Sequence, residues 1–236
     1  MEMQPGNFPS ANSASGDADA VLGNDEFVQA YAAAARLLGT CFAYSPKTPA
    51  ASNAWSALFA MDVADDWPFG GGRSCGGQGA DALAFAARLL RSASDESQAA
   101  RAEEYQRLFV GPGHLQAPPW GSVYMDRDKV LYGCTWVELR EWMREHGVAS
   151  EYDERVPEDQ IGRVLVMSAE VALAQRDALP ELIGRHIAPW AGHYFDVLGD
   201  AAHLASYKGI ALLAKATLSD VVQLLEIEPA KRRLYL

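Results

Sequence analysis

Apolar residues recur at steps of three and four positions through most of this 236-residue chain. In the segment 25–44, Phe27, Tyr31 and Leu38 fall on one side of a helix, and the segment 204–225 repeats the pattern over about six turns. No segment shows the alternation of apolar and polar residues that a half-buried strand requires. The sequence therefore predicts an all-α fold.

Helix start and stop signals divide the chain into about nine to eleven helices within a single globular domain, residues 25–236. Asp81 and Asp95 are expected to open helices, and Pro157 is expected at the first position of another. The N-terminal residues 1–24 are rich in Ser, Ala, Gly and Asp, and we expect a disordered lead-in there. The expected helices span residues 25–44, 51–61, 82–92, 95–110, 135–146, 157–172, 179–187, 189–198 and 204–225.

The charge balance limits the classes of partner. With 20 Lys and Arg against 31 Asp and Glu, the formal net charge is −11, which repels nucleic-acid phosphates and anionic lipid but suits a cationic partner. No stretch approaches the roughly 18 apolar residues of a membrane span, so no direct membrane insertion is expected. Cys41, Cys75 and Cys134 form no CxxC pair, and the N-terminus lacks the features of a secretory signal peptide. These features predict a cytoplasmic protein with reduced thiols.

A loop of unusual composition interrupts the helical pattern at residues 108–126, "LFVGPGHLQAPPWGSVYMD". Connecting loops are usually short and polar, whereas this one contains Phe109, Trp120 and Tyr124. Its aromatic rings must either fill the core beneath the loop or be presented to a partner. The residues alone leave both alternatives open.

Catalytic and metal-binding patterns receive little support from the sequence. His186 and His193 are separated by the helix-breaking Pro189 and do not form an HExxH motif. The glycine-rich segment 70–79 lacks the GxxxxGK[ST] pattern of a phosphate loop, although it would be the phosphate site if the chain were a small helical nucleotide-using enzyme. We therefore expect no metal, no cofactor and no catalytic residue.

Two adjacent acids, Glu158 and Asp159, stand at the expected start of a helix. Adjacent helical residues point about 100° apart, so these two carboxylates cannot form a close catalytic pair. They either complement the helix dipole or, as an exposed acidic helix start, receive an arginine from a partner.

Four ordered motifs resemble the TorD/DmsD family of redox-enzyme maturation chaperones. The first is "EYQRLFVGPGHLQAPPWGSVYMDRDKVLYG" at residues 104–133, followed by "LREWMREHGV" at 139–148, "VPEDQIG" at 156–162 and "RHIAPW" at 185–190. The similarity extends from about Asp25 to the C-terminal helix and is weakest before Asp95.

This resemblance implies a non-catalytic, all-helical cytoplasmic chaperone. Such proteins bind the twin-arginine signal peptide of a molybdopterin oxidoreductase catalytic subunit and delay its export by the Tat pathway until the cofactor is loaded. A client of the dimethyl sulfoxide reductase type is expected, with a nitrate reductase-type subunit as the alternative and Tat translocase components as further candidate partners. By position, the resemblance implies a signal-peptide site made of Tyr105, Leu108, Phe109, Pro118, Pro119, Trp120, Ser122, Tyr124, Glu158, Asp159 and Gln160.

The chain departs from the family at its acidic motif, which is typically Glu-Pro-x-Asp-His. Here Val156 replaces the leading acid and Gln160 replaces the histidine. Gln160 does not titrate, although its side chain can still donate and accept hydrogen bonds. With Pro118 to Trp120 as a rigid wall between two helices, the resemblance predicts that the turn containing Glu158 and Asp159 lies close to this wall.

Overall fold

The computed structural model describes residues 17–70, 78–149 and 156–236. The predicted all-α class is confirmed, and within these residues the only β-type pairing is an isolated antiparallel bridge between Trp120 and Gln160. The helical elements, with π-helical or 3-10 turns labelled η, are α1 (Asp17–Gly23), α2 (Asp25–Ala43), α3 (Pro49–Ala60), α4 (Val63–Asp66), α5 (Gln78–Ser92), α6 (Gln98–Tyr105), η1 (Gln106–Val110), α7 (Gly121–Met125), α8 (Cys134–Glu145), α9 (Ile161–Ala174), η2 (Arg176–Ala178), α10 (Leu179–Leu182), η3 (Ile183–Ile187), α11 (Ala188–Ala201) and α12 (Ala205–Leu224).

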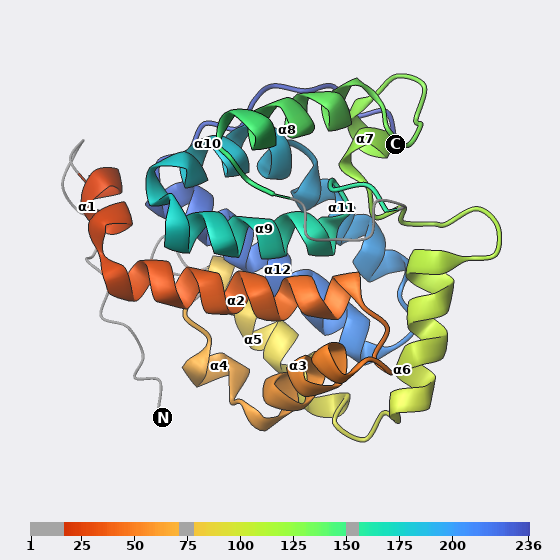
Figure 1. Ribbon diagram of the computed structural model, residues 1–236. Coiled ribbons are helices and arrows are strands. Elements are labelled where there is room, and N and C mark those ends of the chain that lie inside the picture. The colour runs from red at the N-terminus through yellow and green to blue at the C-terminus, as the bar shows by residue number, and fades with distance from the viewer. Residues whose placement is uncertain (1–16, 71–77, 150–155) are drawn as a thin grey trace.

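One helix pair and one group of three helices form the core. α2 packs along α9, and α12 lies between α5 and α11 (Figure 1). The α2–α9 pair is antiparallel, since Gly39 near the end of α2 meets Gly162 near the start of α9. Farther along, the Tyr31 hydroxyl on α2 donates to Ser168 Oγ on α9 at 2.8 Å. The remaining helices cover this core, with α8 above α9 in the view of Figure 1.

The helical part of the chain begins earlier than the sequence predicted. Residues 17–24 were assigned to the disordered lead-in, yet Asp17–Gly23 forms α1. The cause is tertiary, because Val21 and Leu22 are buried. Asn24 then caps α2 through a 2.8 Å bond from the Glu26 amide to its side chain. Residues 1–16 lie outside the described part of the chain.

Several predicted helix starts are wrong. Asp81 lies inside the first turn of α5, which begins at Gln78, and Asp95 precedes α6, whose cap is Ser97. Pro157 does not open α9, because residues 157–160 form a turn, in which the Gln160 amide donates to the Pro157 carbonyl at 3.2 Å, and the helix begins only at Ile161. The short helices α4 and α7 were not expected, whereas α10 and η3 together span the helix that was expected at residues 179–187.

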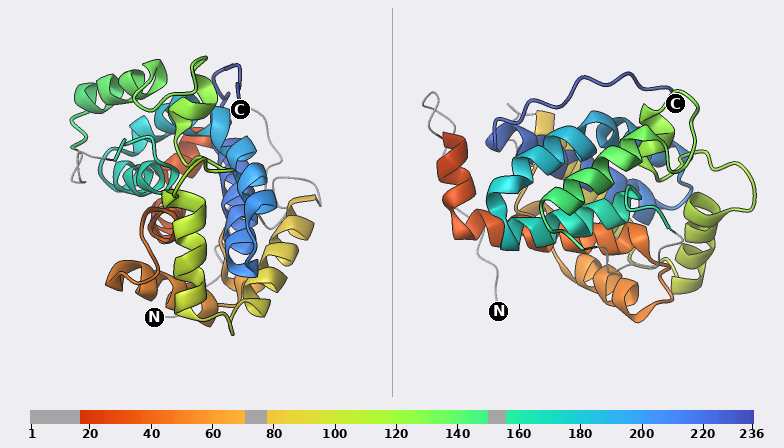
Figure 2. Two further views of the ribbon diagram at one scale, coloured as in Figure 1. Left: turned by 90° about the vertical axis from the view of Figure 1, so that its right-hand side faces the viewer. Right: turned by 45° about the horizontal axis from the view of Figure 1, so that its top comes forward.

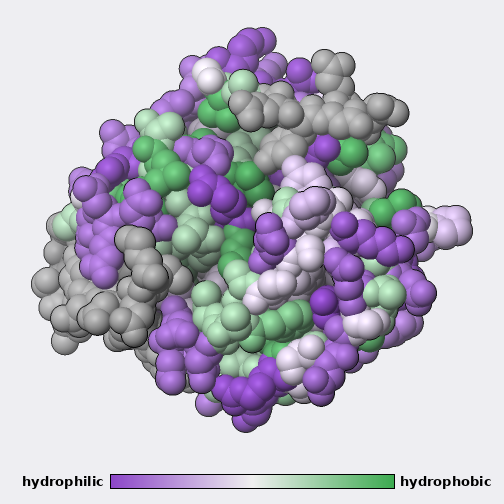
Figure 3. Space-filling model, turned by 60° about the horizontal axis from the view of Figure 1, so that its bottom comes forward, coloured by the Kyte–Doolittle hydropathy of each residue, from purple (hydrophilic) through white to green (hydrophobic). Residues whose placement is uncertain are grey.

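The segment after α12 and its closing turn runs along the surface as an extended tail, residues 227–236, and ends beside α7 (Figure 2). The Ala230 amide donates to the Gly184 carbonyl at 2.8 Å, and the Tyr235 amide donates to the Tyr124 carbonyl at 2.9 Å. Figure 3 shows the lower face of the molecule, where patches of hydrophobic residues lie among hydrophilic ones.

Candidate functional site

The loop before α7 and the turn before α9 are joined directly by backbone hydrogen bonds. The Ile161 amide donates to the Pro119 carbonyl at 2.8 Å, and the Gly121 amide donates to the Asp159 carbonyl at 3.1 Å. These bonds flank the Trp120–Gln160 bridge. The predicted proximity of the proline-rich wall and the acidic turn is therefore confirmed.

Asp159 lies at the centre of this junction. Its side chain is buried, and its Oδ2 accepts a 2.7 Å hydrogen bond from the Ser122 amide at the start of α7. Burial raises the pKa of this carboxyl from 3.8 to about 6, while hydrogen bonding from Ser122 partly opposes the shift. Oδ1 is buried and has no hydrogen-bond partner within the described residues. The junction thus holds a carboxyl group with unused hydrogen-bonding capacity.

Glu158 is bonded to a different helix. Its Oε2 accepts a 2.7 Å hydrogen bond from the indole Nε1 of Trp136 on α8, and Arg140 Nε lies 3.7 Å from its Oε1. Both Glu158 and Asp159 are buried, so of the two alternatives for this acid pair, the one that required an exposed acidic helix start is wrong. The physical reason is that the turn pairs with the loop before α7 instead of continuing α9 toward its N-terminus.

Gln160, which stands where the family has histidine, has a clear structural role. Its Oε1 accepts from the Arg163 amide at 2.9 Å, so the side chain caps α9. Its Nε2 donates to the Phe42 carbonyl at 3.1 Å near the end of α2. Gln160 therefore fixes the turn to both α2 and α9.

The aromatic residues at the end of α6 lie in the core. The Tyr105 hydroxyl donates to the Ala43 carbonyl at 2.8 Å, and the Tyr105 and Phe109 rings stack with centroids 5.0 Å apart. Leu108 and Phe109 belong to the π-helical turn η1 and are buried. Burial raises the pKa of Tyr105 to about 12. Tyr105, Leu108 and Phe109, three of the predicted site residues, therefore lie in the core next to the loop that begins after η1.

The remaining predicted site residues lie at or just before α7. Pro118, Pro119, Ser122 and Tyr124 are buried, with Tyr124 stacked on Trp190 at a centroid distance of 5.6 Å. Trp120 is half-buried, and its Nε1 lacks a hydrogen-bond partner within the described residues. Of the predicted wall, Trp120 is therefore the side chain with both an accessible surface and an unpaired polar atom.

Two neighbours of Glu158 escaped the sequence reasoning. Neither Trp136 nor Arg140 is among the site residues that the sequence predicted. The signal that could have found them is their spacing: residues i and i+4 on a helix form adjacent side chains, here an aromatic ring and a guanidinium. Their contact with residue 158 depends on how α8 packs and cannot be read from spacing.

The described residues contain no group of three or more His, Cys, Asp or Glu side chains arranged to hold a metal ion. His186 is buried, and burial lowers its pKa to about 4, whereas His193 is exposed. Most of the glycine-rich segment 70–79 and all of Cys75 lie outside the described residues. Within the described ranges, no helix combines the length and apolar character that crossing a membrane would require.

Comparison with known proteins places the chain in a family. The model of the family described as "Nitrate reductase delta subunit" matches residues 78–196. The "Tat proofreading chaperone DmsD" of Salmonella typhimurium is 36% identical over 191 residues, which is 80% of this chain and 88% of that protein. The "Probable Tat proofreading chaperone DmsD" of Haemophilus influenzae is 36% identical over 50% of this chain and 58% of that protein.

Among solved structures, a putative redox enzyme maturation protein from Archaeoglobus fulgidus aligns with a TM-score of 0.48 and 14% identity, covering 77% of this chain and 90% of that one. The assignment follows from the sequence matches, which cover the junction between the loop before α7 and the turn before α9. The chain belongs to the TorD/DmsD family of redox-enzyme maturation chaperones.

Proposed function

We propose that this chain is a non-catalytic cytoplasmic chaperone that binds the twin-arginine signal peptide of a molybdenum-containing oxidoreductase. It holds the client until cofactor loading and assembly are complete and then releases it for export by the Tat pathway. A client of the dimethyl sulfoxide reductase type is favoured by the names of the relatives, which are Tat proofreading chaperones called DmsD.

The observation that carries the proposal is the buried Asp159 carboxyl with its unpaired Oδ1 at the loop–turn junction. A carboxylate with free acceptor capacity suits a guanidinium, because charge-assisted hydrogen bonds are among the strongest in proteins. Glu158 stands beside it, and the half-buried Trp120 ring offers apolar surface to the peptide segment that follows the arginines. The net charge of −11 accelerates encounter with a cationic peptide.

Calorimetry with the full chain and a synthetic peptide of two arginines followed by an apolar segment tests the electrostatic part. The double variant Glu158→Gln with Asp159→Asn is expected to bind this peptide about tenfold or more weakly at low salt, since a charged hydrogen bond contributes about 1.5–3 kcal/mol. The deficit should shrink as salt screens the wild-type attraction. A peptide with both arginines replaced by glutamine is the control, and equal affinity of wild type and double variant would contradict the proposal.

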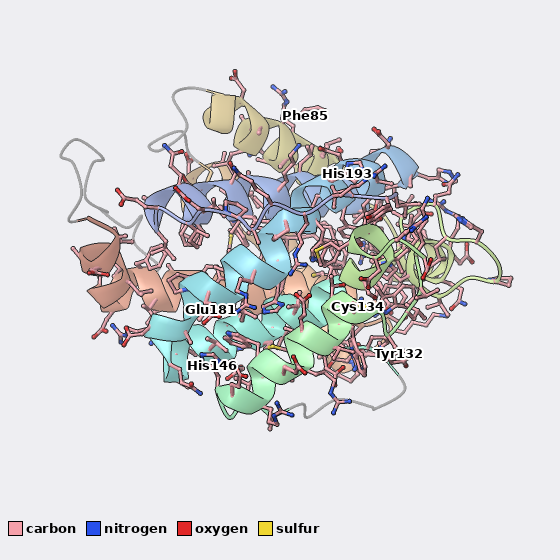
Figure 4. All side chains as sticks on the ribbon, turned by 90° about the horizontal axis from the view of Figure 1, so that it is seen from above. Phe85, Tyr132, Cys134, His146, Glu181 and His193 are labelled. Carbon is pink, nitrogen blue, oxygen red and sulfur yellow. The ribbon has the colours of Figure 1, made fainter. Side chains whose placement is uncertain are left out.

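Trp120→Ala tests the apolar part. Because Trp120 is half-buried, its truncation is expected to weaken peptide binding about tenfold while lowering the melting temperature only modestly. Phe85→Ala is the matched control, since Phe85 is an exposed aromatic residue on α5, away from the junction (Figure 4). A large loss of stability with normal affinity would assign Trp120 to the core and not to the peptide site.

A nitrate reductase-type client is the second candidate, and the description of the matching family model favours it. The two candidates differ in the enzyme that the chaperone retains. Affinity capture from the native cells, followed by mass identification of the co-purified catalytic subunit, decides between a dimethyl sulfoxide reductase-type and a nitrate reductase-type client.

A further inference from the structure

Trp136 on α8 contacts two other side chains beside Glu158: Tyr132, which lies just before α8, and Arg140, which lies one turn further along it. The Tyr132 ring meets the Trp136 ring edge-on with centroids 5.0 Å apart, and the Arg140 Cζ atom lies 5.2 Å from the Trp136 ring centroid. The Trp136 indole also donates its 2.7 Å hydrogen bond to Glu158 Oε2. Figure 4 shows Tyr132 at the end of the loop that leads into α8.

The Arg140 guanidinium is held weakly in this arrangement. Its Nε lies 3.7 Å from Glu158 Oε1, which is beyond normal hydrogen-bond range, and its side chain is 57% exposed. The Glu158 side chain, in contrast, is only 11% exposed. An exposed arginine at this distance contributes little, whereas a buried carboxylate gains from a well-aligned, charge-assisted partner.

A guanidinium group can use both an indole ring and a carboxylate that is hydrogen-bonded to the edge of that ring. The planar cation can stack on the ring while its N–H groups donate to the carboxylate. Arg140 lies over the ring and within ion-pair distance of the carboxylate, but its Nε is too far from Oε1 for a normal hydrogen bond. The site therefore offers more to an arginine from outside, which can approach without the constraint of the α8 backbone.

We propose that Trp136 and Glu158 form a subsite for one arginine of the bound peptide, and that Arg140 occupies this subsite as a stand-in until the peptide displaces it. This inference rests on the proposed function and adds to it a recognition residue, Trp136, and a competing residue, Arg140.

An exposed apolar surface next to the subsite fits the apolar segment of the same peptide. Four side chains are between 40% and 49% exposed there, namely Val130, Leu131, Tyr132 and Val137. Val137 lies on α8, and the loop that carries the other three is tied to the start of α8, since the Asp126 carboxylate accepts a 3.0 Å hydrogen bond from Thr135 Oγ1. A twin-arginine signal peptide has an apolar segment after its arginines, so one ligand can cover both features.

Arg140→Ala gives the sharpest test, because the expected change is a gain. Removal of a competing exposed arginine should tighten binding of the twin-arginine peptide to the full chain by about two- to fivefold, the range expected for a surface cation–π and ion-pair contact. A gain of affinity cannot result from misfolding. Arg144→Ala is the matched control. Arg144 is exposed on the same helix one turn later, and its replacement removes the same charge.

Trp136→Leu tests the ring. This variant should weaken binding about three- to tenfold and should lose the preference of the wild type for a twin-arginine over a twin-lysine peptide. A circular dichroism melt checks that the variant folds. The preference ratio compares two peptides on the same variant, so it remains valid even if part of the variant is unfolded.

The outcomes separate the two proposals. If the wild type binds the twin-arginine peptide, but Arg140→Ala binds no tighter than Arg144→Ala and Trp136→Leu keeps the arginine preference, the subsite is overturned while the proposed function stands. If the wild type does not bind the peptide at all, both are overturned. Tightening by Arg140→Ala alone, together with loss of the arginine preference in Trp136→Leu, supports the subsite.

Discussion

The buried carboxyl of Asp159 has an ionisation equilibrium that folding shifts. Its pKa rises from 3.8 to about 6 because burial disfavours the charged form. Between these values the folded chain binds more protons than the unfolded chain, so this group makes stability fall as the pH rises from about 4 to about 6, and the full cost remains above pH 6. Asp159→Asn removes this cost and keeps an oxygen that can accept from the Ser122 amide. We expect the variant to be more stable than wild type at pH 7.5 by on the order of 1–3 kcal/mol.

Folding shifts the pKa of His186 in the opposite direction. Its effect on the pH dependence of stability must therefore be separated from that of Asp159. Burial lowers its pKa from 6.5 to about 4, so its contribution to stability is lost as the pH falls through this window. In the wild type, the contributions of Asp159 and His186 to the slope of unfolding free energy against pH partly cancel. The informative quantity is therefore the difference in unfolding free energy between Asp159→Asn and wild type, measured in urea at several pH values between 4 and 7.5. A difference that does not change with pH would show that Asp159 does not titrate in this range.

The crossing of α2 and α9 depends on glycine at both contact positions. A Cβ atom on Gly39 would lie 2.7 Å from the Gly162 carbonyl oxygen, and a Cβ atom on Gly162 would lie 2.5 Å from the Gly39 carbonyl oxygen. Backbone atoms cannot move aside cheaply, so Gly162→Ala is expected to destabilise the fold by about 1–3 kcal/mol. This loss outweighs the gain of up to about 1 kcal/mol that alanine brings to a helix interior. Denaturant unfolding at an unchanged m-value measures the net effect.

Gly192→Ala on α11 is the control for this prediction. A Cβ atom added there meets nothing within 4 Å, so only the helix-propensity gain applies and the variant should be as stable as wild type or more so. If both variants stabilise the protein, the close crossing of α2 and α9 does not limit stability. A destabilised Gly162→Ala should also bind the peptide less well, because Gln160 and the Phe42 carbonyl are joined across the same crossing.

At the level of elements, long apolar stripes were predictable and tertiary effects were not. α2 and α12 lie within a residue or two of their predicted bounds, since each carries several turns of one buried face. α7 escaped prediction because a five-residue helix has too few turns to show a period. The start of α9 was misplaced because Pro157 satisfies a local rule, whereas the turn that follows it is fixed by bonds to the loop before α7.

At the level of the whole molecule, residues distant in sequence become one site through packing. The family motifs led to Trp120 and Asp159, and the structure brings their segments together. Trp136 and Arg140 could not be found in this way, because their importance depends on α8 lying over the turn that contains Glu158. Likewise, Tyr105 and Phe109 look like surface recognition residues in the motif but lie in the core.

The extended tail joins four elements that are far apart in the sequence, and this gives it a role in holding α7 in place. The tail bonds to η3 through Ala230 and to α7 through Tyr235. Arg232 of the tail pairs with Glu138 on α8. The carbonyl oxygen of Leu236 lies 2.9 Å from His193 Nε2 on α11. Deletion of residues 229–236 should therefore lower the melting temperature by roughly 3–8 °C, which corresponds to about 1–2 kcal/mol in a domain of this size. Hydrogen exchange should accelerate at residues 121–125, whereas the amides in the middle of α2 and α9 should keep their order of protection.

Arg232→Ala alone should change little, because its ion pair is partly exposed. Unchanged exchange at residues 121–125 in the deletion variant would mean that α7 is held by Trp190 and the loop–turn bonds without the tail.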